Sequence, residues 1–300
     1  MLDVKGRIDH FDVDLAGRRL LMSALGNNTV EVFDLRTNQR IYSIHGLHEP
    51  QGVTYAPESN RIFVANGDDG TVRIFNGETY KLLKVVRFPS DADDTRYDPA
   101  MRRVVVGYGG GGRAGVGVLD GTNGRLLATI GLPGHPESFQ LEALADRSFV
   151  NIPLAGAIID VVNRSERKVI ATWQLGGAGA NFPMALDEAD QRLFITCRTP
   201  AEMLVLDLQS GKIVDRIPCV GDADDMWYDA AGKRIYISGG EGFISAIARD
   251  DPDHYRQIAK IKTAPGARTS FFVPKLKRLY LAVPRRAGHV AELWIYEVEP

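Results

Sequence analysis

The chain has 300 residues, of which 44% are hydrophobic and 25% charged, a composition typical of a globular protein and unlike that of disordered or collagen-like chains. Lys and Arg number 36 against 38 Asp and Glu, a formal net charge of −2, so no nucleic-acid partner is expected. The sequence contains no stretch of about 18 apolar residues, so no membrane span is predicted, and the charged residues soon after Met1 argue against an export signal. We expect a soluble protein, cytoplasmic as the sequence stands, or periplasmic or secreted if a leader has been removed.

One pattern occurs seven times along the chain: an alternating apolar strand, a second strand, a glycine-rich loop, a third strand and a fourth. The second strands are predicted to begin 42 to 45 residues apart, at Leu20, Ile62, Val104, Ser148, Leu193, Ile235 and Leu279. A period of about 40–45 residues with four short strands per unit indicates a β-propeller. We therefore predict an all-β, seven-bladed β-propeller with four-stranded antiparallel blades.

The second copy is the most regular. Residues 53–55 alternate, residues 61–66 (RIFVAN) form a second strand, and residues 71–75 and 82–87 supply the third and fourth strands. Asn-Gly and Asp-Gly pairs between the second and third strands provide the positive φ angles that tight hairpins need.

The third strands are predicted to end in a residue whose side chain can bond to the turn that follows. Six successive copies end in Asp34, Asn76, Asp120, Asn163, Asp207 and Asp250. Asp and Asn recur at such positions because their side-chain oxygen accepts a hydrogen bond from the backbone about two residues further on.

The whole chain, residues 1–300, is predicted to be one domain. The predicted blades are 8–46, 49–89, 91–133, 135–176, 178–220, 222–265 and 267–300 plus 2–5. The last copy is one strand short, so residues 2–5 are expected to supply its outer strand and close the ring, removing an open sheet edge. Cys197 and Cys219 are predicted to be free thiols on the second and fourth strands of one blade, too far apart for a disulfide.

Residues 63–67 (FVANG) and 70–72 (GTV) resemble the repeat that gives the YVTN-repeat (YncE-like) bacterial β-propeller family its name. The likeness recurs at 194–196 (FIT) and 236–239 (YISG) and covers essentially the whole chain, although copies three, four and seven depart from the tetrapeptide. This resemblance implies the propeller fold and no single reaction, so function must be argued from a site.

Polar residues occupy six of the seven positions where a first strand is predicted to begin, a position that faces the channel mouth of a propeller. The seven positions read Asp9, Gln51, Asp93, Glu137, Phe182, Asp224 and Arg268. We predict an acidic, ligand-binding mouth, with Asp9, Gln51, Asp93, Asn181, Asp224 and Arg268 as the ligand-binding residues.

A metal site is a further hypothesis. Copies three and six begin with the same four residues, at 91–94 and 222–225 (DADD), three blades apart. One Asp of each pair can face the axis, because neighbouring strand residues alternate. Asp94, Glu137 and Asp225 could then hold a Ca²⁺ or Mg²⁺ ion. In the alternative, these carboxylates are solvated and cap strand ends.

His10 and His135 lie beside the same strand starts, and Glu137 follows His135 closely. An imidazole near a carboxylate can act as an acid or base, so both histidines are candidate catalytic residues. The alternative is two loop histidines held by hydrogen bonds. Residues 109–112 (GGGG) are interpreted as a flexible loop, because neither a phosphate-binding Lys-Ser nor a helix follows.

Two functions stay open. The favoured one is a non-catalytic scaffold that binds an unknown small molecule or protein, with no cofactor assigned. The alternative is a divalent-metal-dependent hydrolase (lactonase-like) or lyase, similar to gluconolactonase and streptogramin-lyase propellers, whose ligand motifs cannot be matched here residue by residue. A third possibility is a docking scaffold whose channel mouth has no function of its own.

Overall fold

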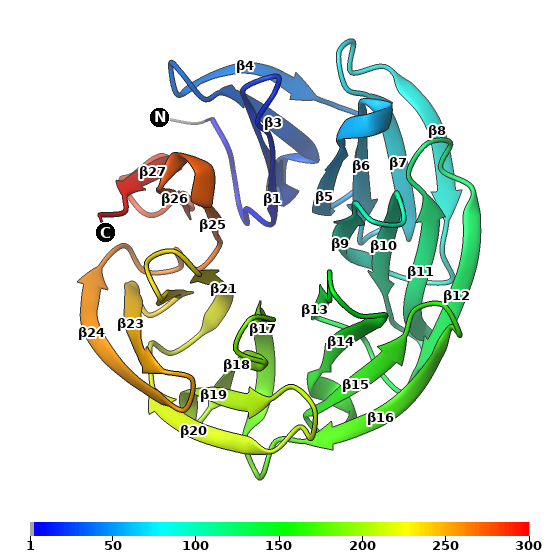
Figure 1. Cartoon of the computed structure of the whole chain (residues 1–300). Helices are drawn as coiled ribbons and strands as arrows, with labels where there is room; N and C mark the ends of the chain where they lie inside the picture. The colour runs from blue at the N-terminus through cyan, green and yellow to red at the C-terminus, as the bar shows by residue number, and fades with distance from the viewer. Residues whose placement is uncertain (1–2, 300) are drawn as a thin grey trace. The chain divides into compact units, whose positions relative to one another are not determined.

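The computed structural model describes residues 3–299 (Figure 1). Within these residues the strands form seven antiparallel sheets, each built from strands that follow one another in the chain. The predicted all-β architecture of seven repeated sheets is therefore confirmed. The described part of the chain contains no helix long and apolar enough to cross a membrane.

The chain divides into two compact units. The N-terminal unit comprises residues 3–136 with 284–291, and the C-terminal unit comprises residues 137–283 with 292–299. Each is described below by itself, and the expectation of a single domain stays a prediction.

The N-terminal unit contains three four-stranded sheets. Their strands are β1 (Phe11–Asp14), β2 (Arg19–Ala24), β3 (Thr29–Asp34) and β4 (Gln39–Ile44); β5 (Pro50–Ala56), β6 (Arg61–Asn66), β7 (Thr71–Asn76) and β8 (Leu82–Arg87); and β9 (Ala92–Asp98), β10 (Arg103–Tyr108), β11 (Ala114–Asp120) and β12 (Leu126–Leu132).

The C-terminal unit contains three four-stranded sheets and, within the described residues, one three-stranded sheet. Their strands are β13 (Ser138–Leu141), β14 (Arg147–Ile152), β15 (Ile158–Asn163) and β16 (Lys168–Gln174); β17 (Gly179–Asp187), β18 (Arg192–Thr199), β19 (Ala201–Asp207) and β20 (Ile213–Pro218); β21 (Ala223–Asp229), β22 (Arg234–Gly239), β23 (Phe243–Asp251) and β24 (His254–Lys262); and β25 (Ser270–Val273), β26 (Arg278–Val283) and β27 (Glu292–Glu297).

Each second strand begins with an arginine, one residue before the predicted position, so the predicted period is confirmed. In the first sheet, Arg19 forms an ion pair with Asp14 at the end of the preceding strand. In the fourth sheet, Arg147 donates to both carboxylate oxygens of Glu142, at 2.7 Å each. These arginines tie the second strand to the turn before it.

The predicted Asp and Asn turns form as expected in five sheets. Asp34 Oδ1, for example, accepts hydrogen bonds from the backbone N–H groups of Arg36 and Thr37 at 2.9 and 2.7 Å. The sixth sheet differs, because β23 continues to Asp251, which accepts from the N–H of Asp253 at 2.8 Å. Its predicted last residue, Asp250, instead forms an ion pair with Arg256 in β24.

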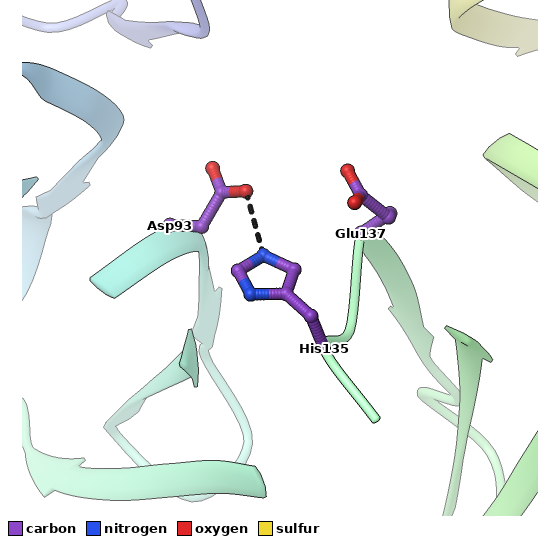
Figure 2. Close-up of side chains that lie close together, drawn as sticks. All are labelled: Asp93, His135 and Glu137. Carbon is purple, nitrogen blue, oxygen red and sulfur yellow. Dashed lines mark hydrogen bonds and ion pairs between the residues drawn. The ribbon is translucent and has the colours of Figure 1, made fainter. Parts of the chain in front are cut away.

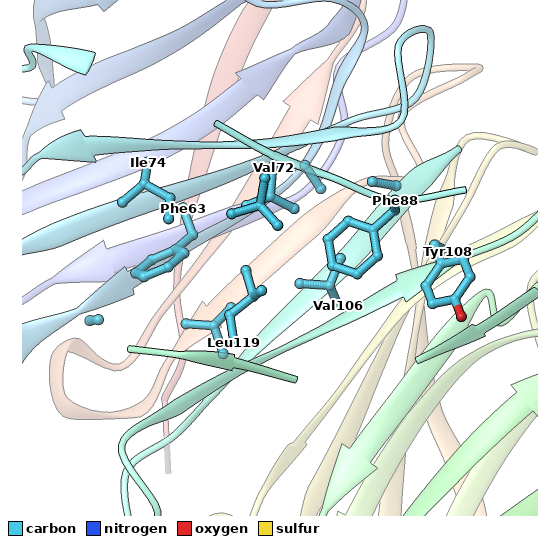
Figure 3. Packing of buried hydrophobic residues seen from close by; sticks show 12 residues of the cluster. Phe63, Val72, Ile74, Phe88, Val106, Tyr108 and Leu119 are labelled. Atoms are coloured by element: carbon cyan, nitrogen blue, oxygen red, sulfur yellow. The ribbon is translucent and has the colours of Figure 1, made fainter. Parts of the chain in front are cut away.

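Apolar side chains pack between the second and third sheets of the N-terminal unit (Figure 3). Phe63 and Ile74 contribute from the second sheet and Val106 from the third, all fully buried. Phe88, just after β8, lies with its ring centroid 5.2 Å from that of Tyr108. Because successive side chains of a strand point to opposite faces of its sheet, each of these strands directs one set of apolar side chains into a core shared by the two sheets.

The seventh sheet has three strands within the described residues. Residues 3–5, part of the segment expected to complete it, are not in a strand. The N–H of Lys5 donates to Asn27 Oδ1 at 2.8 Å, and Asn27 Nδ2 donates to the carbonyl of Asp3 at 2.9 Å. The side chain of Asn27 thus satisfies these backbone groups in place of a sheet partner. Leu2 lies outside the described residues.

Both cysteines are free, as predicted. Cys197 lies in β18, and Cys219 follows the last residue of β20. Burial raises the pKa of each thiol to about 12. Neither thiol is therefore poised to ionise near neutral pH.

Candidate functional site

Five polar residues of the N-terminal unit form a group that we call the Asp93 cluster: Asp9, His10, Asp91, Asp93 and His135. His135 Nε2 lies 3.1 Å from Asp93 Oδ2, a hydrogen bond visible in Figure 2. His10 Nε2 lies 3.9 Å from the other Asp93 oxygen and 3.7 Å from Asp9 Oδ1. Asp93 therefore stands between two imidazoles.

Elements of the first and third sheets and their flanking loops hold this cluster in place. Asp93 lies on β9, at the start of the third sheet, and His10 directly precedes β1. His135 lies in the loop after β12, and both histidines keep part of their side chain exposed, 20% for His10 and 14% for His135. The cluster can therefore reach solvent while its carboxylates are mostly buried.

Gly109 allows His135 to approach closely. A Cβ atom at Gly109 would lie 2.5 Å from His135 Nδ1 and 2.7 Å from His135 Cα. The N–H of Gly109 donates to the carbonyl of Asp91 at 2.9 Å, which joins the end of β10 to the cluster. Residues 109–112 were predicted to be a flexible loop only, because this role of Gly109 depends on packing between segments distant in sequence.

Asp91 was not among the predicted site residues. Gln51 Nε2 donates to Asp91 Oδ1 at 2.7 Å, which brings the predicted residue Gln51 to the cluster. Burial, with the nearby charge of Asp93 adding to it, raises the pKa of Asp91 to about 6, although His135 and Gln51 act in the opposite direction. The repeated sequence at 91–94 is the signal that could have indicated Asp91, but only its last two residues, Asp93 and Asp94, were predicted to have a function.

Asp94, a predicted metal ligand, is fully buried and forms an ion pair with Arg96. Burial raises the pKa of Asp94, while the charges of Arg96 and His10 lower it. Of the two neighbouring carboxylates, Asp93 is the one that contacts His135, and Asp94 contacts an arginine of its own strand.

The C-terminal unit contains a second polar group, which we call the Arg198 cluster: Phe182, Arg198, Asp222, Asp224 and Arg268. Arg198 Nη2 lies 2.6 Å from Asp224 Oδ1, and Arg268 Nε lies 3.1 Å from Asp224 Oδ2. Asp222 bridges the same two arginines at 3.3 and 3.0 Å. The guanidinium carbon of Arg198 lies 3.8 Å from the centroid of the Phe182 ring, within cation–π range.

The other predicted residues of this unit have backbone and amide partners. Asp225 Oδ2 accepts from the N–H of Ser270 at 2.8 Å, and Asn181 Nδ2 donates to Asn151 Oδ1 at 2.9 Å within a fully buried pair. The N–H of Glu137 donates to the Asn151 carbonyl at 3.1 Å.

The structure thus brings Asp9, His10, Asp93 and His135 together in one unit, with Gln51 joined through Asp91. It brings Asp224 and Arg268 together in the other. The proposed ion ligands are divided between the units, Asp94 in the N-terminal and Glu137 and Asp225 in the C-terminal unit. The metal assignment stays a prediction.

Comparison with known proteins bears on the fold. One similar solved structure is a chain of Kuenenia stuttgartiensis hydrazine synthase, with a TM-score of 0.86, 15% sequence identity and 99% of each chain covered. This chain has the fold of a seven-bladed β-propeller. In all, 1604 chains of solved structures match, so the fold is shared too widely to indicate one activity.

Sequence comparison adds no family. No protein-family model matches the chain, and no curated protein matches its sequence. The YVTN-repeat resemblance therefore stays a prediction, and the hydrazine synthase likeness, at 15% identity, shows the fold alone.

Proposed function

We propose that this chain is a non-catalytic binding propeller of the YVTN-repeat type, which recognises a polar small molecule or a polar loop of a protein through the Asp93 cluster. The observation that carries the proposal is the placement of one mostly buried carboxylate, Asp93, between two partly exposed imidazoles. Ligand pockets commonly place a few convergent polar groups to fix orientation.

The chemistry of the cluster favours a ligand that donates hydrogen bonds or carries positive charge. Asp9, Asp91 and Asp93 bring three carboxylates together, whereas the positive charge beside them comes from Arg7, 2.7 Å from Asp9, and from two histidines whose charge depends on protonation. An amine or a hydroxyl group would compensate the buried carboxylates better than an anion would. We therefore expect amines, amino acids or polyols to bind and phosphates to be excluded.

The test is a thermal-shift screen of small amines, amino acids, polyols and phosphates. A ligand present at about one hundred times its dissociation constant stabilises the folded state by about 2.7 kcal/mol, which raises the melting temperature. We expect this shift to disappear in a His10→Gln, His135→Gln double variant and to persist in a His45→Gln control, since His45 is exposed. An unchanged shift in the double variant would contradict the assignment of the site.

The second candidate is a metal-dependent hydrolase or lyase. The hydrogen bond between His135 and Asp93, at 3.1 Å, favours it, because a carboxylate that orients an imidazole is the arrangement of a general base. In this proposal Asp94, Glu137 and Asp225 would hold the ion, and His10 or His135 would act as the base. Hydrolysis of simple lactones that requires added Ca²⁺ or Mg²⁺ and is lost in His135→Gln would favour it over the binding proposal.

A further inference from the structure

The seventh sheet ends on an open edge within the described residues. Its last strand, β27, pairs with β26 on one side, whereas the third strand of each of the other six sheets also pairs with a fourth strand. An edge strand presents a row of unpaired N–H and C=O groups that can pair with another chain. β27 is therefore able to accept one more strand.

A groove of about 320 Å³ lies between the sixth and seventh sheets, beside this edge. Its apolar lining residues include Ile244, Ala246, Ile258, Ile261, Leu279 and Tyr296. Ile258 and Ile261 on β24 are 41% and 38% exposed. These side chains would be shielded from water by a strand added along β27.

The neighbouring sheets show what a fourth strand does at this position. Tyr255 of β24 packs against Phe194 of the preceding sheet, with ring centroids 5.5 Å apart. Ile213 of β20 packs into a cluster that contains Trp173 of the sheet before it. A fourth strand thus gives an apolar side chain to the preceding sheet, and the groove beside β27 is where the seventh sheet would place one.

The charges on the third strands indicate which charge a strand bound beside β27 should carry. Basic residues of the fourth strand pair with acidic residues of the third in three sheets: Arg40 with Glu31 at 3.2 Å, Arg216 with Glu202 at 2.6 Å and Arg256 with Asp250 at 3.0 Å. β27 carries Glu292, whose Oε2 accepts from Trp294 Nε1 at 2.9 Å, and Glu297 on the opposite face of the strand.

Glu297 is 80% exposed, and its partner within the described residues, Arg278, lies 3.5 Å away. Two copies of β27 paired edge to edge would set these acidic strands against each other, and like charges opposite one another destabilise a sheet. A basic strand fits the edge, and a second copy of this chain does not.

We propose that the β27 edge and its groove bind an extended, basic peptide segment of a partner protein, added antiparallel as the fourth strand of the seventh sheet. Main-chain hydrogen bonds to β27 would supply affinity, as in other complexes formed by strand addition. An apolar side chain of the peptide enters the groove between Ile258 and Tyr296, and its Lys or Arg side chains face Glu292 and Glu297.

The test uses a fluorescent, end-blocked peptide with the sequence of residues 254–262 (HYRQIAKIK), which combines apolar and basic side chains. Fluorescence anisotropy should show saturable binding to the full chain. Because Glu297 is exposed, a Glu297→Lys variant should fold and weaken binding about tenfold, the equivalent of about 1.4 kcal/mol. Glu78→Lys, an exposed turn residue of the N-terminal unit, is the matched control and should leave binding unchanged.

The groove is tested separately. Ile258→Gln should weaken binding by about fivefold through loss of apolar contact, whereas Ile170→Gln, on the outer strand β16 and 48% exposed, should not. Hydrogen exchange should slow at β27 backbone amides when the peptide is added, a signature that binding by charge alone would not produce.

Several outcomes would overturn the proposal. One is the absence of saturable binding, and another is binding that neither Glu297→Lys nor Ile258→Gln weakens. Dimerisation seen by sedimentation, together with slowed hydrogen exchange of the β27 amides in the absence of peptide, would assign the edge to a second copy of the chain. Binding that requires prior deletion of residues 1–5 would assign it to the N-terminal segment of the chain itself.

Discussion

At the scale of single residues, burial opposes the ionisation of two carboxyl groups of the N-terminal unit, Asp91 and Asp12. Burial raises the pKa of Asp91 to about 6, and burial also raises that of Asp12, on β1 of the same unit, to about 6. Asp12 accepts hydrogen bonds from the N–H groups of Tyr55 and Val13 at 2.6 and 2.7 Å. These residues couple the stability of the unit to pH in the range where histidine also titrates.

The first prediction concerns Asp91. Its pKa in the folded state, about 6, exceeds its ordinary value of 3.8, so the folded protein binds this proton more tightly and gains stability as pH falls from about 6 to 4. Above pH 6 the ionised group opposes folding. An Asp91→Asn variant keeps an acceptor for Gln51 and should be more stable at pH 7 by about 1 kcal/mol after allowing for screening at this partly exposed site.

Melting temperatures of the wild type and Asp91→Asn between pH 4 and pH 7 provide the measurement. The variant should melt about 2 °C higher at pH 7, and the difference should vanish near pH 4. In both proteins Asp12 should leave a remaining dependence of the melting temperature on pH, because its pKa is also raised. Asp68→Asn, with a side chain 66% exposed, is the control. Equal curves for all three proteins would mean that Asp91 ionises normally.

At the scale of elements, strand ends position the cluster, and Gly109 is the tightest point. It directly follows β10, and a side chain there would overlap His135. Gly131 in β12 is a matched site, because a Cβ there meets nothing within 4 Å. The two glycines therefore separate the effect of a methyl group in a strand from its effect on the site.

The second prediction follows from this contrast. Gly109→Ala should destabilise the protein by about 1–3 kcal/mol, since an added methyl group in a packed site forces its neighbours to shift. It should also displace His135 from Asp93 and alter the NMR titration of that imidazole. Gly131→Ala should change neither quantity. A Gly109→Ala protein with the wild-type titration curve would show that His135 is held by other contacts.

At the scale of the whole molecule, six sheets share a four-stranded plan, the seventh has three strands within the described residues, and the sheets differ in the charges at their first strands. The N-terminal unit carries carboxylates with histidines, whereas in the C-terminal unit two arginines neutralise two aspartates in the Arg198 cluster. Asp94 pairs with Arg96, and Asp225 accepts from a backbone N–H. Each of these contacts uses one carboxylate oxygen, Asp94 Oδ1 and Asp225 Oδ2, that an ion would otherwise bind.

The third prediction is that the protein folds and melts independently of divalent ions. We expect less than one Ca²⁺ or Mg²⁺ ion per chain by mass spectrometry. We also expect the same melting temperature with chelator and with added Ca²⁺, Mg²⁺ or Mn²⁺, because the binding proposal needs no ion. One bound ion per chain, with a melting temperature that rises with ion concentration as mass action requires, would favour the hydrolase.

The sequence by itself determined the strand plan. Three local properties of the sequence predicted it: the alternation of apolar and polar residues, the glycine, Asp and Asn residues at turns, and the repeat of 42 to 45 residues. Local hydrogen bonds, such as those that Asp34 accepts, form these turns in the structure. The residues at the starts of the first strands also followed from the repeat, because register along a strand fixes which positions recur. Hence His10, Asp93 and His135 were identified before their contacts were known.

Tertiary structure alone decided which of these residues meet and what surrounds them. The repeat could not tell Asp93 from Asp94, since the difference lies in their neighbours: His135 for one and Arg96 for the other. Nor could it reveal the proximity of Gly109 to His135 or the burial that raises the pKa of Asp91. Close packing and desolvation depend on residues distant in sequence, and no local pattern encodes them.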